Sequence, residues 1–148
     1  MIKNRIEHKN RKASYEYTFI RELEAGIQLI GPEVKSIRNH GLSFIDSYCQ
    51  FEGNELYVYK LNIAQEAINP SFESLRKRKL LLRSKELIKL QKDLDEGMTI
   101  IPYKFFENQK GIFKLQIALA KGKKLYDKRE SIKKKDIERE AKRDLAGK

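Results

Sequence analysis

Alternation of apolar and polar side chains predicts a chain built mainly of β-strands. The alternation begins at Tyr15, Tyr17 and Phe19, which are separated by the polar residues Glu16 and Thr18, and this period of two is typical of a half-buried strand. Gly26 interrupts the continuation of the strand, which indicates either a bulge or a close approach of another part of the backbone. Residues 1–12 lack the pattern and are expected to form a mobile basic leader.

Two hairpins are predicted further along the chain. Residues 43–52 and 55–61 form the first, because Gly53-Asn54 between them is a turn typical of antiparallel hairpins. Residues 98–107 and 111–121 form the second. The last of these strands alternates apolar residues on one face with polar residues on the other: Phe113, Leu115, Ile117 and Leu119 against Lys114 and Gln116.

The spacing also predicts two short helices. Gly31-Pro32 opens the first, since proline at the first helical position gives up no helical hydrogen bond. Lys35 and Arg38 are three residues apart and are therefore neighbours on its outer face, and Gly41 ends the helix. The second helix is predicted from Ser84, a good N-cap, to Glu96.

About five strands, with one helix after the first strand and another before the last hairpin, predict a mainly β fold with short helices. We expect an OB-fold-like small closed barrel. Residues 62–75 lack periodicity and are predicted to be a long loop, in which Phe72 is a candidate for stacking on a base. The predicted organisation is a basic leader (1–12), an OB-like domain (13–121) and a basic C-terminal tail (122–148).

Basic residues are concentrated in the tail and in one internal run. The chain of 148 residues has a formal net charge of +11, and residues 122–148 hold eleven Lys or Arg against six Asp or Glu. The tail has too few apolar residues to fold alone, so we expect it to be disordered when free and helical when bound to RNA. This clustering favours a polyanionic partner over a merely soluble basic protein.

The internal basic run at 76–83 places five Lys or Arg beside an apolar triplet. Arginine suits phosphate recognition, because its planar guanidinium can donate two hydrogen bonds to one phosphate. A solvated charge run beside a core strand is the alternative. Lys35, Arg38 and Lys114 would form a second basic face only if the fold brings them together.

Residues that could carry catalysis or bind a metal are scarce. His8 and His40 match neither a metal-ligand spacing nor a catalytic triad, and no phosphate-binding glycine loop occurs. Cys49 has no partner and is expected to be a small interior residue. No apolar stretch approaches the roughly 20 residues that span a bilayer. We therefore expect a cytoplasmic protein that is not an enzyme, with no cofactor, metal or membrane contact.

Five separated motifs carry a family resemblance. They are Asn10-Arg11-Lys12-Ala13, Glu24-Ala25-Gly26, Glu33-Val34-Lys35-Ser36-Ile37-Arg38, Arg78-Lys79-Leu80-Leu81-Leu82, and Gly122-Lys123-Lys124 with Asp127-Lys128-Arg129. In their order and spacing they resemble the SsrA-binding protein family, the small protein B of bacterial trans-translation. The resemblance covers nearly all of the chain.

The resemblance implies an RNA-binding adaptor that makes and breaks no bond. Its OB-fold body would bind the tRNA-like domain of transfer-messenger RNA, and its tail would occupy the decoding centre and empty mRNA channel of a stalled ribosome. By position, the implied RNA-binding residues are Glu24, Leu81 and Lys114, with Asn10, Lys35, Arg38, Arg76, Arg78 and Lys79 as neighbours. The implied decoding-centre residues are Lys123, Lys124, Asp127, Lys128 and Arg129.

The partners expected from the resemblance are transfer-messenger RNA, the ribosome with the RNA of its small subunit, and elongation factor Tu in the same complex. The protein itself is expected to be a monomer. A general single-strand-binding OB module is the alternative, because a basic groove would suffice for that function.

Overall fold

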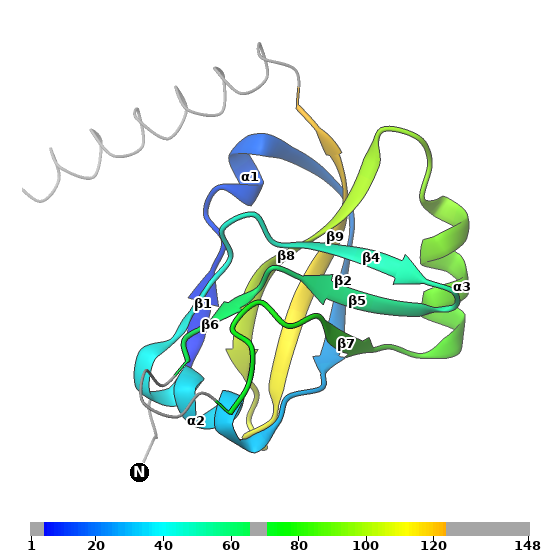
Figure 1. Cartoon of the computed structure of the whole chain (residues 1–148). Helices are drawn as coiled ribbons and strands as arrows, with labels where there is room; N and C mark the ends of the chain where they lie inside the picture. The colour runs from blue at the N-terminus through cyan, green and yellow to red at the C-terminus, as the bar shows by residue number, and fades with distance from the viewer. Residues whose placement is uncertain (1–4, 66–70, 124–148) are drawn as a thin grey trace, which may run out of the picture.

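The computed structural model describes residues 5–65 and 71–123, which form a mainly β structure with a few short helices (Figure 1). The elements are, in chain order, β1 (Glu7–Lys9), α1 (Ala13–Glu16), β2 (Tyr17–Ile27), α2 (Gly31–His40), β3 (Leu42–Ser43), β4 (Tyr48–Glu52), β5 (Glu55–Tyr59), β6 (Asn62–Ile63), β7 (Arg78–Leu81), α3 (Ser84–Asp93), β8 (Met98–Glu107) and β9 (Phe113–Gly122). Within these two ranges, no helix is both long and apolar enough to cross a membrane.

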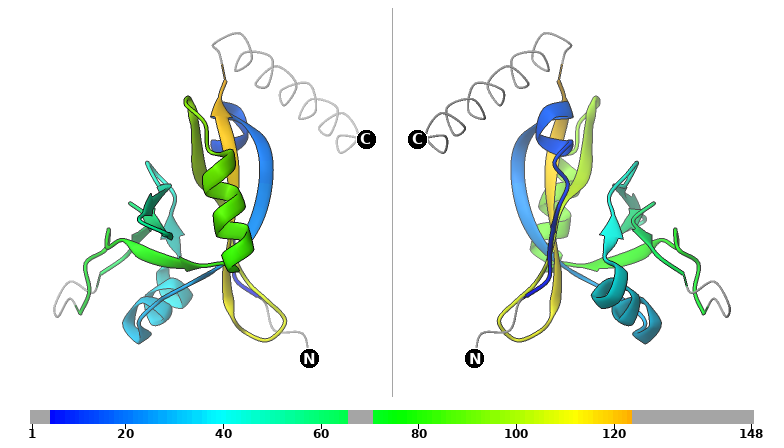
Figure 2. Two further views of the ribbon diagram at one scale, coloured as in Figure 1. Left: turned by 90° about the vertical axis from the view of Figure 1, so that its right-hand side faces the viewer. Right: turned by 90° about the vertical axis from the view of Figure 1, so that its left-hand side faces the viewer.

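Antiparallel pairing joins seven of these strands in the order β1-β8-β4-β5-β7-β2-β9, and β9 also pairs with β8. The long strands β2, β9 and β8 form one twisted group, while β4, β5 and β7 form a second group inclined to it (Figure 2). Strand pairing can therefore be followed from β8 through β4, β5, β7, β2 and β9, and the last of these strands pairs with β8 again. The short strands β3 and β6 pair with each other.

The core lies between the two groups of strands. Apolar residues from β5, β7, β8 and β9 are almost completely buried there, and they include Leu56, Val58, Leu80, Ile100, Leu115 and Ile117. The alternation predicted for β9 is confirmed, because its four apolar members are buried and its two polar members are half-buried. Leu90 anchors α3 against this core. Cys49 is buried as expected, and burial raises the pKa of its thiol.

The structure corrects the prediction for the N-terminal segment. Glu7–Lys9 forms β1, which pairs with β8, so the expectation of a mobile leader is wrong for these residues. The first long strand begins at Tyr17 instead of Tyr15, because Ala13–Glu16 forms a short helix. The helix buries Ala13 in a small cluster with Ile101 and two alanines of β9, a packing contact that the alternation does not reveal.

The region around the first hairpin also differs from the prediction. Residues 43–52 are divided between β3 and β4 by a loop in which Asp46 has a φ of 63°. The segment 62–75 is not wholly a loop, because it begins with β6. Phe72 is only 9% exposed and belongs to the core cluster, so its predicted stacking role is wrong.

The second predicted helix is confirmed with a shorter extent. Its first residue is Ser84, but α3 ends at Asp93 instead of Glu96. The chain then turns at Gly97, whose φ of 82° favours glycine. The basic run at 76–83 includes β7, which lies between β5 and β2 in the sheet. Its alternate residues therefore face the core and the surface in turn.

Candidate nucleic-acid interface

The outer face of β7, β2 and β9 is centred on Gly26. This glycine lies directly opposite Leu81 of β7 on one side and Lys114 of β9 on the other. Directly opposed residues of an antiparallel pair point to the same face of a sheet, so Leu81 and Lys114 flank Gly26. A Cβ at position 26 would lie 3.2 Å from the Cβ of Leu81. The register shift of β2 lies between Phe19 and Arg21 and not at Gly26, and the atoms that approach Gly26 closely belong to the side chain of Leu81.

Glu24 lies on the same outer face, two residues before Gly26 along β2. It is exposed, and it lies opposite Gln116 of β9. Leu81 is 47% exposed although it is apolar. The fold thus brings Glu24, Leu81 and Lys114 together on three adjacent strands, although they span 91 positions of the sequence (24 to 114). This convergence depends on strand order, which spacing alone does not give.

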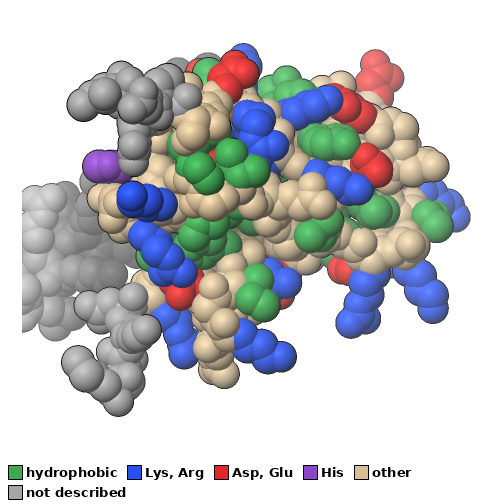
Figure 3. All heavy atoms as spheres, turned by 60° about the horizontal axis from the view of Figure 1, so that its bottom comes forward, with side chains coloured by type: hydrophobic (Ala, Val, Ile, Leu, Met, Phe, Trp, Pro, Cys, Tyr) green, Lys and Arg blue, Asp and Glu red, His purple; other side chains and the backbone are tan. Residues whose placement is uncertain are grey.

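The helix α2 places a second set of cations near the hairpin that joins β8 to β9. Arg38 Nη1 lies 3.2 Å from Glu107 Oε2, and the guanidinium lies 5.0 Å from the centre of the Phe113 ring. Lys35 is exposed on the same helix. Figure 3 shows Lys and Arg side chains spread over this end of the molecule, with hydrophobic side chains between them. The surface therefore offers both charge and apolar contact.

Arg78 needs a correction, because its guanidinium is fully buried and cannot reach an RNA. Arg78 Nε donates to Glu33 Oε2 at 2.5 Å, and its Nη1 donates to the carbonyl of Leu61 at 2.6 Å. Both Arg78 and Glu33 are 0% exposed. The alternation along β7 turns Arg78 inward, whereas Lys79 and Leu81 face outward. Arg78 is thus a structural residue that joins β7 to α2.

Glu33 is the centre of this buried network, and it was not among the predicted site residues. Its Oε1 accepts a hydrogen bond from Ile30 N–H at 3.0 Å and another from Arg76 Nη2 at 2.5 Å. The sequence did carry a signal, because Glu33 is the third residue of a helix opened by proline, where a carboxylate caps the helix start. Glu33 therefore fixes α2 and the basic run to each other.

The network sets the ionisation of its members. Burial by itself would raise the pKa of the Glu33 carboxyl, but hydrogen bonds from Arg76 and Ile30 and the charge of Arg78 outweigh it. The pKa of Glu33 therefore lies below its ordinary value. Burial also lowers the pKa of Arg78, against the opposing charge of Glu33. The buried Glu33 carboxylate thus has two guanidinium partners, of which Arg78 is buried with it and Arg76 is partly exposed.

Two other predicted site residues of the basic run, Arg76 and Lys79, reach the surface. The side chain of Arg76 is 37% exposed and is held from below by Glu33, while its buried Nε has no hydrogen-bond partner. Lys79 lies 2.9 Å from Glu55 across β5 and β7. Lys79 therefore lies on the face that carries Leu81, whereas Arg76 reaches the surface beside α2; each has one carboxylate neighbour.

Asn10 joins the N-terminal segment to β8 and is held by two hydrogen bonds. Its backbone N–H donates to the carbonyl of Tyr103 at 2.8 Å, and its side-chain amide donates to the carbonyl of Pro102 at 3.0 Å. At the other end of the described chain, Lys123 N–H donates to the carbonyl of Glu16 at 2.9 Å. The tail therefore begins beside α1. The other predicted tail residues, Lys124, Asp127, Lys128 and Arg129, lie outside the described residues.

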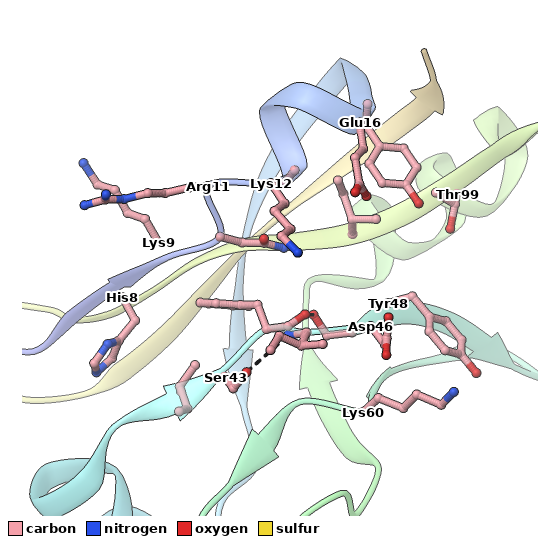
Figure 4. Close-up of a pocket in the computed structure, with 18 residues that line it drawn as sticks. His8, Lys9, Arg11, Lys12, Glu16, Ser43, Asp46, Tyr48, Lys60 and Thr99 are labelled. Carbon is pink, nitrogen blue, oxygen red and sulfur yellow. Dashed lines mark hydrogen bonds between the residues drawn. The ribbon is translucent and has the colours of Figure 1, made fainter. Parts of the chain in front are cut away.

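A wide groove of about 860 Å³ separates the N-terminal segment from the loop between β3 and β4 (Figure 4). Lys12 and Glu16 line it from the side of α1, and Asp46 and Lys60 line it from the opposite side. Asp46 and Lys60 both have a positive φ, 63° and 58°, which is uncommon for residues other than glycine. The groove is not evident from the sequence, because its two walls come from segments that are far apart along the chain.

Residues 5–65 and 71–123 contain no cluster of three or more His, Cys, Asp or Glu side chains that could hold a metal ion. His8 packs against Gly41, where an added Cβ would lie 3.0 Å from the imidazole. His40 is exposed at the end of α2.

Replacement of Gly26 with Ala tests whether the close approach of Leu81 matters. The added Cβ would press on Leu81 Cβ at 3.2 Å, so the side chain must shift by a few tenths of an ångström. We expect little change in thermal stability, because the backbone entropy saved by alanine offsets the crowding. RNA affinity is expected to fall about three- to tenfold in a filter-binding assay. Gly122→Ala, at a site where a Cβ meets no atom within 4 Å and φ is not positive, is the control for RNA affinity.

The fold and this surface define a class: a small, mainly β protein that presents cations, an exposed leucine and a carboxylate on one sheet face. Comparison with known proteins identifies the family. Residues 7–147 match the model of the SmpB protein family, and the chain belongs to that family.

The relatives are similar over almost their whole length. The SsrA-binding protein of Cytophaga hutchinsonii is 48% identical, with 97% of this chain and 95% of the relative covered. That of Phocaeicola vulgatus is 49% identical, with 91% and 92% covered. A chain of the solved structure "tmRNA-SmpB: a journey to the center of the bacterial ribosome" is 37% identical, has a TM-score of 0.69, and covers 85% of this chain and 94% of its own.

Proposed function

We propose that the protein is an RNA-binding adaptor of trans-translation, which binds the tRNA-like domain of transfer-messenger RNA and delivers it to stalled ribosomes. The observation that carries the proposal is the convergence of Glu24, Leu81 and Lys114 around Gly26 on one open face. Membership of the SmpB family and the relatives named SsrA-binding protein support the same function. The related chain in a structure of tmRNA-SmpB and the ribosome supports both partners.

Each residue of the face suits a different part of a folded RNA. Lys114 provides a cation for phosphate, and Leu81 provides an apolar surface for a ribose or base. Glu24 would repel phosphate, so it is placed to accept hydrogen bonds from base or ribose groups. Arg38, Lys35, Arg76 and Lys79 extend the positive charge at the edges of this face. Such distributed contacts suit recognition of RNA by shape and backbone.

The body is proposed to be an OB-like barrel. The pairing path from β8 through β4, β5, β7, β2 and β9 back to β8 supports this view. The pairing of β4 with β8 rests on one residue pair, Cys49 with Ile100, so the two groups of strands separate away from that point. The basic tail over residues 122–148 is proposed to enter the decoding centre and the mRNA channel. Its residues Lys123, Lys124, Asp127, Lys128 and Arg129 would act there.

Further partners follow from this proposal. Elongation factor Tu would join the complex, the protein would act as a monomer, and its work on the ribosome would place it in the cytoplasm. The adaptor would bind and position RNA without making or breaking a bond. A competing proposal, a general single-strand-binding module, would need only the basic surface.

Competition binding separates the two proposals. The wild-type protein is expected to prefer the tRNA-like domain of transfer-messenger RNA over an unstructured RNA of equal length by more than about tenfold at matched salt. Matched salt is essential, because contacts to phosphate weaken with salt for both RNAs. Equal affinity for the two RNAs would favour the single-strand-binding module and contradict the adaptor.

Truncation after Lys123 tests the separate roles of body and tail. The cut keeps all of β9 and the hydrogen bond from Lys123 N–H to Glu16. We expect affinity for the tRNA-like domain within about threefold of wild type, since the face around Gly26 is intact. Peptide tagging on stalled ribosomes in a reconstituted translation assay is expected to be abolished. A truncated protein that tags normally, or that no longer binds the RNA, would contradict this division.

A further inference from the structure

A hollow of about 500 Å³ opens on the same side of the sheet as the proposed RNA face. Gln116 connects the two, because it lies in the wall of the hollow and directly opposite Glu24 of β2. Across the other edge of β9, Gln116 lies opposite Lys104 of β8. An RNA chain that covers Glu24 and Lys114 would therefore pass the mouth of this hollow.

Two aromatic rings line the interior of the hollow. The ring centres of Phe19 and Tyr103 are 5.1 Å apart at an angle of 42°, and both side chains are half-buried. Ala118 of β9 lies opposite Glu22 and Ile101 and is fully buried in the cluster with Ala13, against which both rings pack. An aromatic surface of this kind is suited to stacking with a nucleic-acid base.

The polar groups of the hollow are arranged for a base edge and a backbone. Glu22 is exposed and forms no ion pair with any other described residue, and Gln116 is half-buried beside it. A carboxylate can only accept hydrogen bonds, whereas an amide can donate and accept. Guanine presents two adjacent donors, N1–H and the 2-amino group, which match a carboxylate. Lys104 and Arg11 add positive charge at the rim, where phosphates would lie.

We propose that this hollow binds one unpaired guanine of the RNA, stacked on Tyr103 and read by Glu22 and Gln116. The inference rests on the proposed function and extends it from a face that holds RNA to a site that selects one base. Bases of RNA loops are commonly unstacked from their neighbours, placed on an aromatic side chain and read on the Watson–Crick edge. The adaptor would thereby distinguish its RNA from others of similar shape.

Inosine substitution tests the base reading directly, because inosine lacks the 2-amino group of guanine. The probes are tRNA-like domains of transfer-messenger RNA in which each unpaired guanine is replaced in turn. With the wild-type protein, one position is expected to lower affinity about tenfold, a typical discrimination for a base contact. Glu22→Gln is expected to weaken binding of the unmodified RNA by a similar factor. For the Glu22→Gln variant, inosine at that position should cause no further loss of RNA affinity, because the two changes remove the same contact and their effects do not add.

Substitutions of Tyr103 test the stacking. Tyr103→Leu is expected to lower affinity about tenfold, whereas Tyr103→Phe keeps the ring and should stay within about twofold of wild type. Tyr48→Leu, at a half-buried tyrosine of β4 that stacks on Tyr59, is the matched control. If Tyr103→Leu fails to fold, the Glu22 series still decides, because Glu22 is exposed and its replacement leaves the packing intact.

Two failures can be told apart. If no inosine position weakens binding to the wild-type protein, or if the losses of inosine and Glu22→Gln add, the guanine site is refuted while the preference for the tRNA-like domain can still hold. If the wild-type protein does not prefer that domain over unstructured RNA, the proposed function fails and the guanine site fails with it.

Discussion

Replacing Leu81 with Asp is expected to lower affinity for the tRNA-like domain about a hundredfold or more without unfolding the protein. Leu81 is 47% exposed beside Gly26, at the centre of the proposed face, so its side chain contributes little to the core. The substitution removes the apolar contact and places a carboxylate where RNA phosphates approach. A hundredfold loss corresponds to about 2.8 kcal/mol of binding free energy, a size typical of a central interface residue.

Fluorescence anisotropy with labelled RNA at fixed salt measures this loss. Ile88→Asp is the matched control, because Ile88 is an exposed apolar residue of α3 at 68% exposure and receives the same new charge. The control should bind within about threefold of wild type. Equal losses for the two variants would mean that net charge matters and the position of Leu81 does not.

Replacing Glu33 with Gln is expected to destabilise the fold by about 3 to 5 kcal/mol, the cost of leaving a buried charge without its partner. The substitution keeps the size of the side chain but removes the negative charge that faces Arg78 and Arg76. The midpoint of thermal unfolding should fall by roughly 10 °C or more. Glu55→Gln, which removes an exposed ion pair with Lys79, should leave the midpoint nearly unchanged.

A second substitution and the pH dependence of stability test whether the unpaired buried charge causes this loss of stability. Adding Arg78→Met to Glu33→Gln removes the uncompensated cation and is expected to recover part of the lost stability. Because the pKa of Glu33 is below its ordinary value in the folded state, the wild-type protein has this stabilisation in full above the unfolded-state pKa. The stabilisation is lost as pH falls through the folded-state pKa. If Glu33→Gln unfolds at the wild-type temperature, the network is not a source of stability.

The sequence alone predicted the fold correctly where the hydrophobic or turn pattern is local. The alternation along Phe113–Gly122 correctly predicted which residues of β9 face the core, and Gly31-Pro32 correctly predicted the start of α2. The same reasoning failed for Ala13–Glu16 and Phe72. Their structure is determined by packing against distant residues of β9 and of the core, and no local period reports such contacts.

Prediction of the candidate site from the sequence was limited in the same way, because the site depends on contacts between distant residues. Glu24, Leu81 and Lys114 were named from a family resemblance, and their adjacency became visible only with the order β7-β2-β9. Arg78 was misassigned because a run of basic residues does not reveal which of them turns inward. The alternation along β7 decides this, and the buried carboxylate of Glu33 makes it possible. A buried partner 45 positions away cannot be read from charge patterning.

Site-directed crosslinking tests the central claim, that the outer face of β7, β2 and β9 holds the RNA. Cys49 is buried and only 4% exposed, so a new surface cysteine can be labelled selectively with a photoreactive group. Gln28→Cys places the label two residues from Gly26 on the same face, and Ile88→Cys places it on α3. Strong crosslinks to the tRNA-like domain from position 28, with almost none from position 88, are predicted. Crosslinks mainly from position 88, or equal yields from both, would contradict the account.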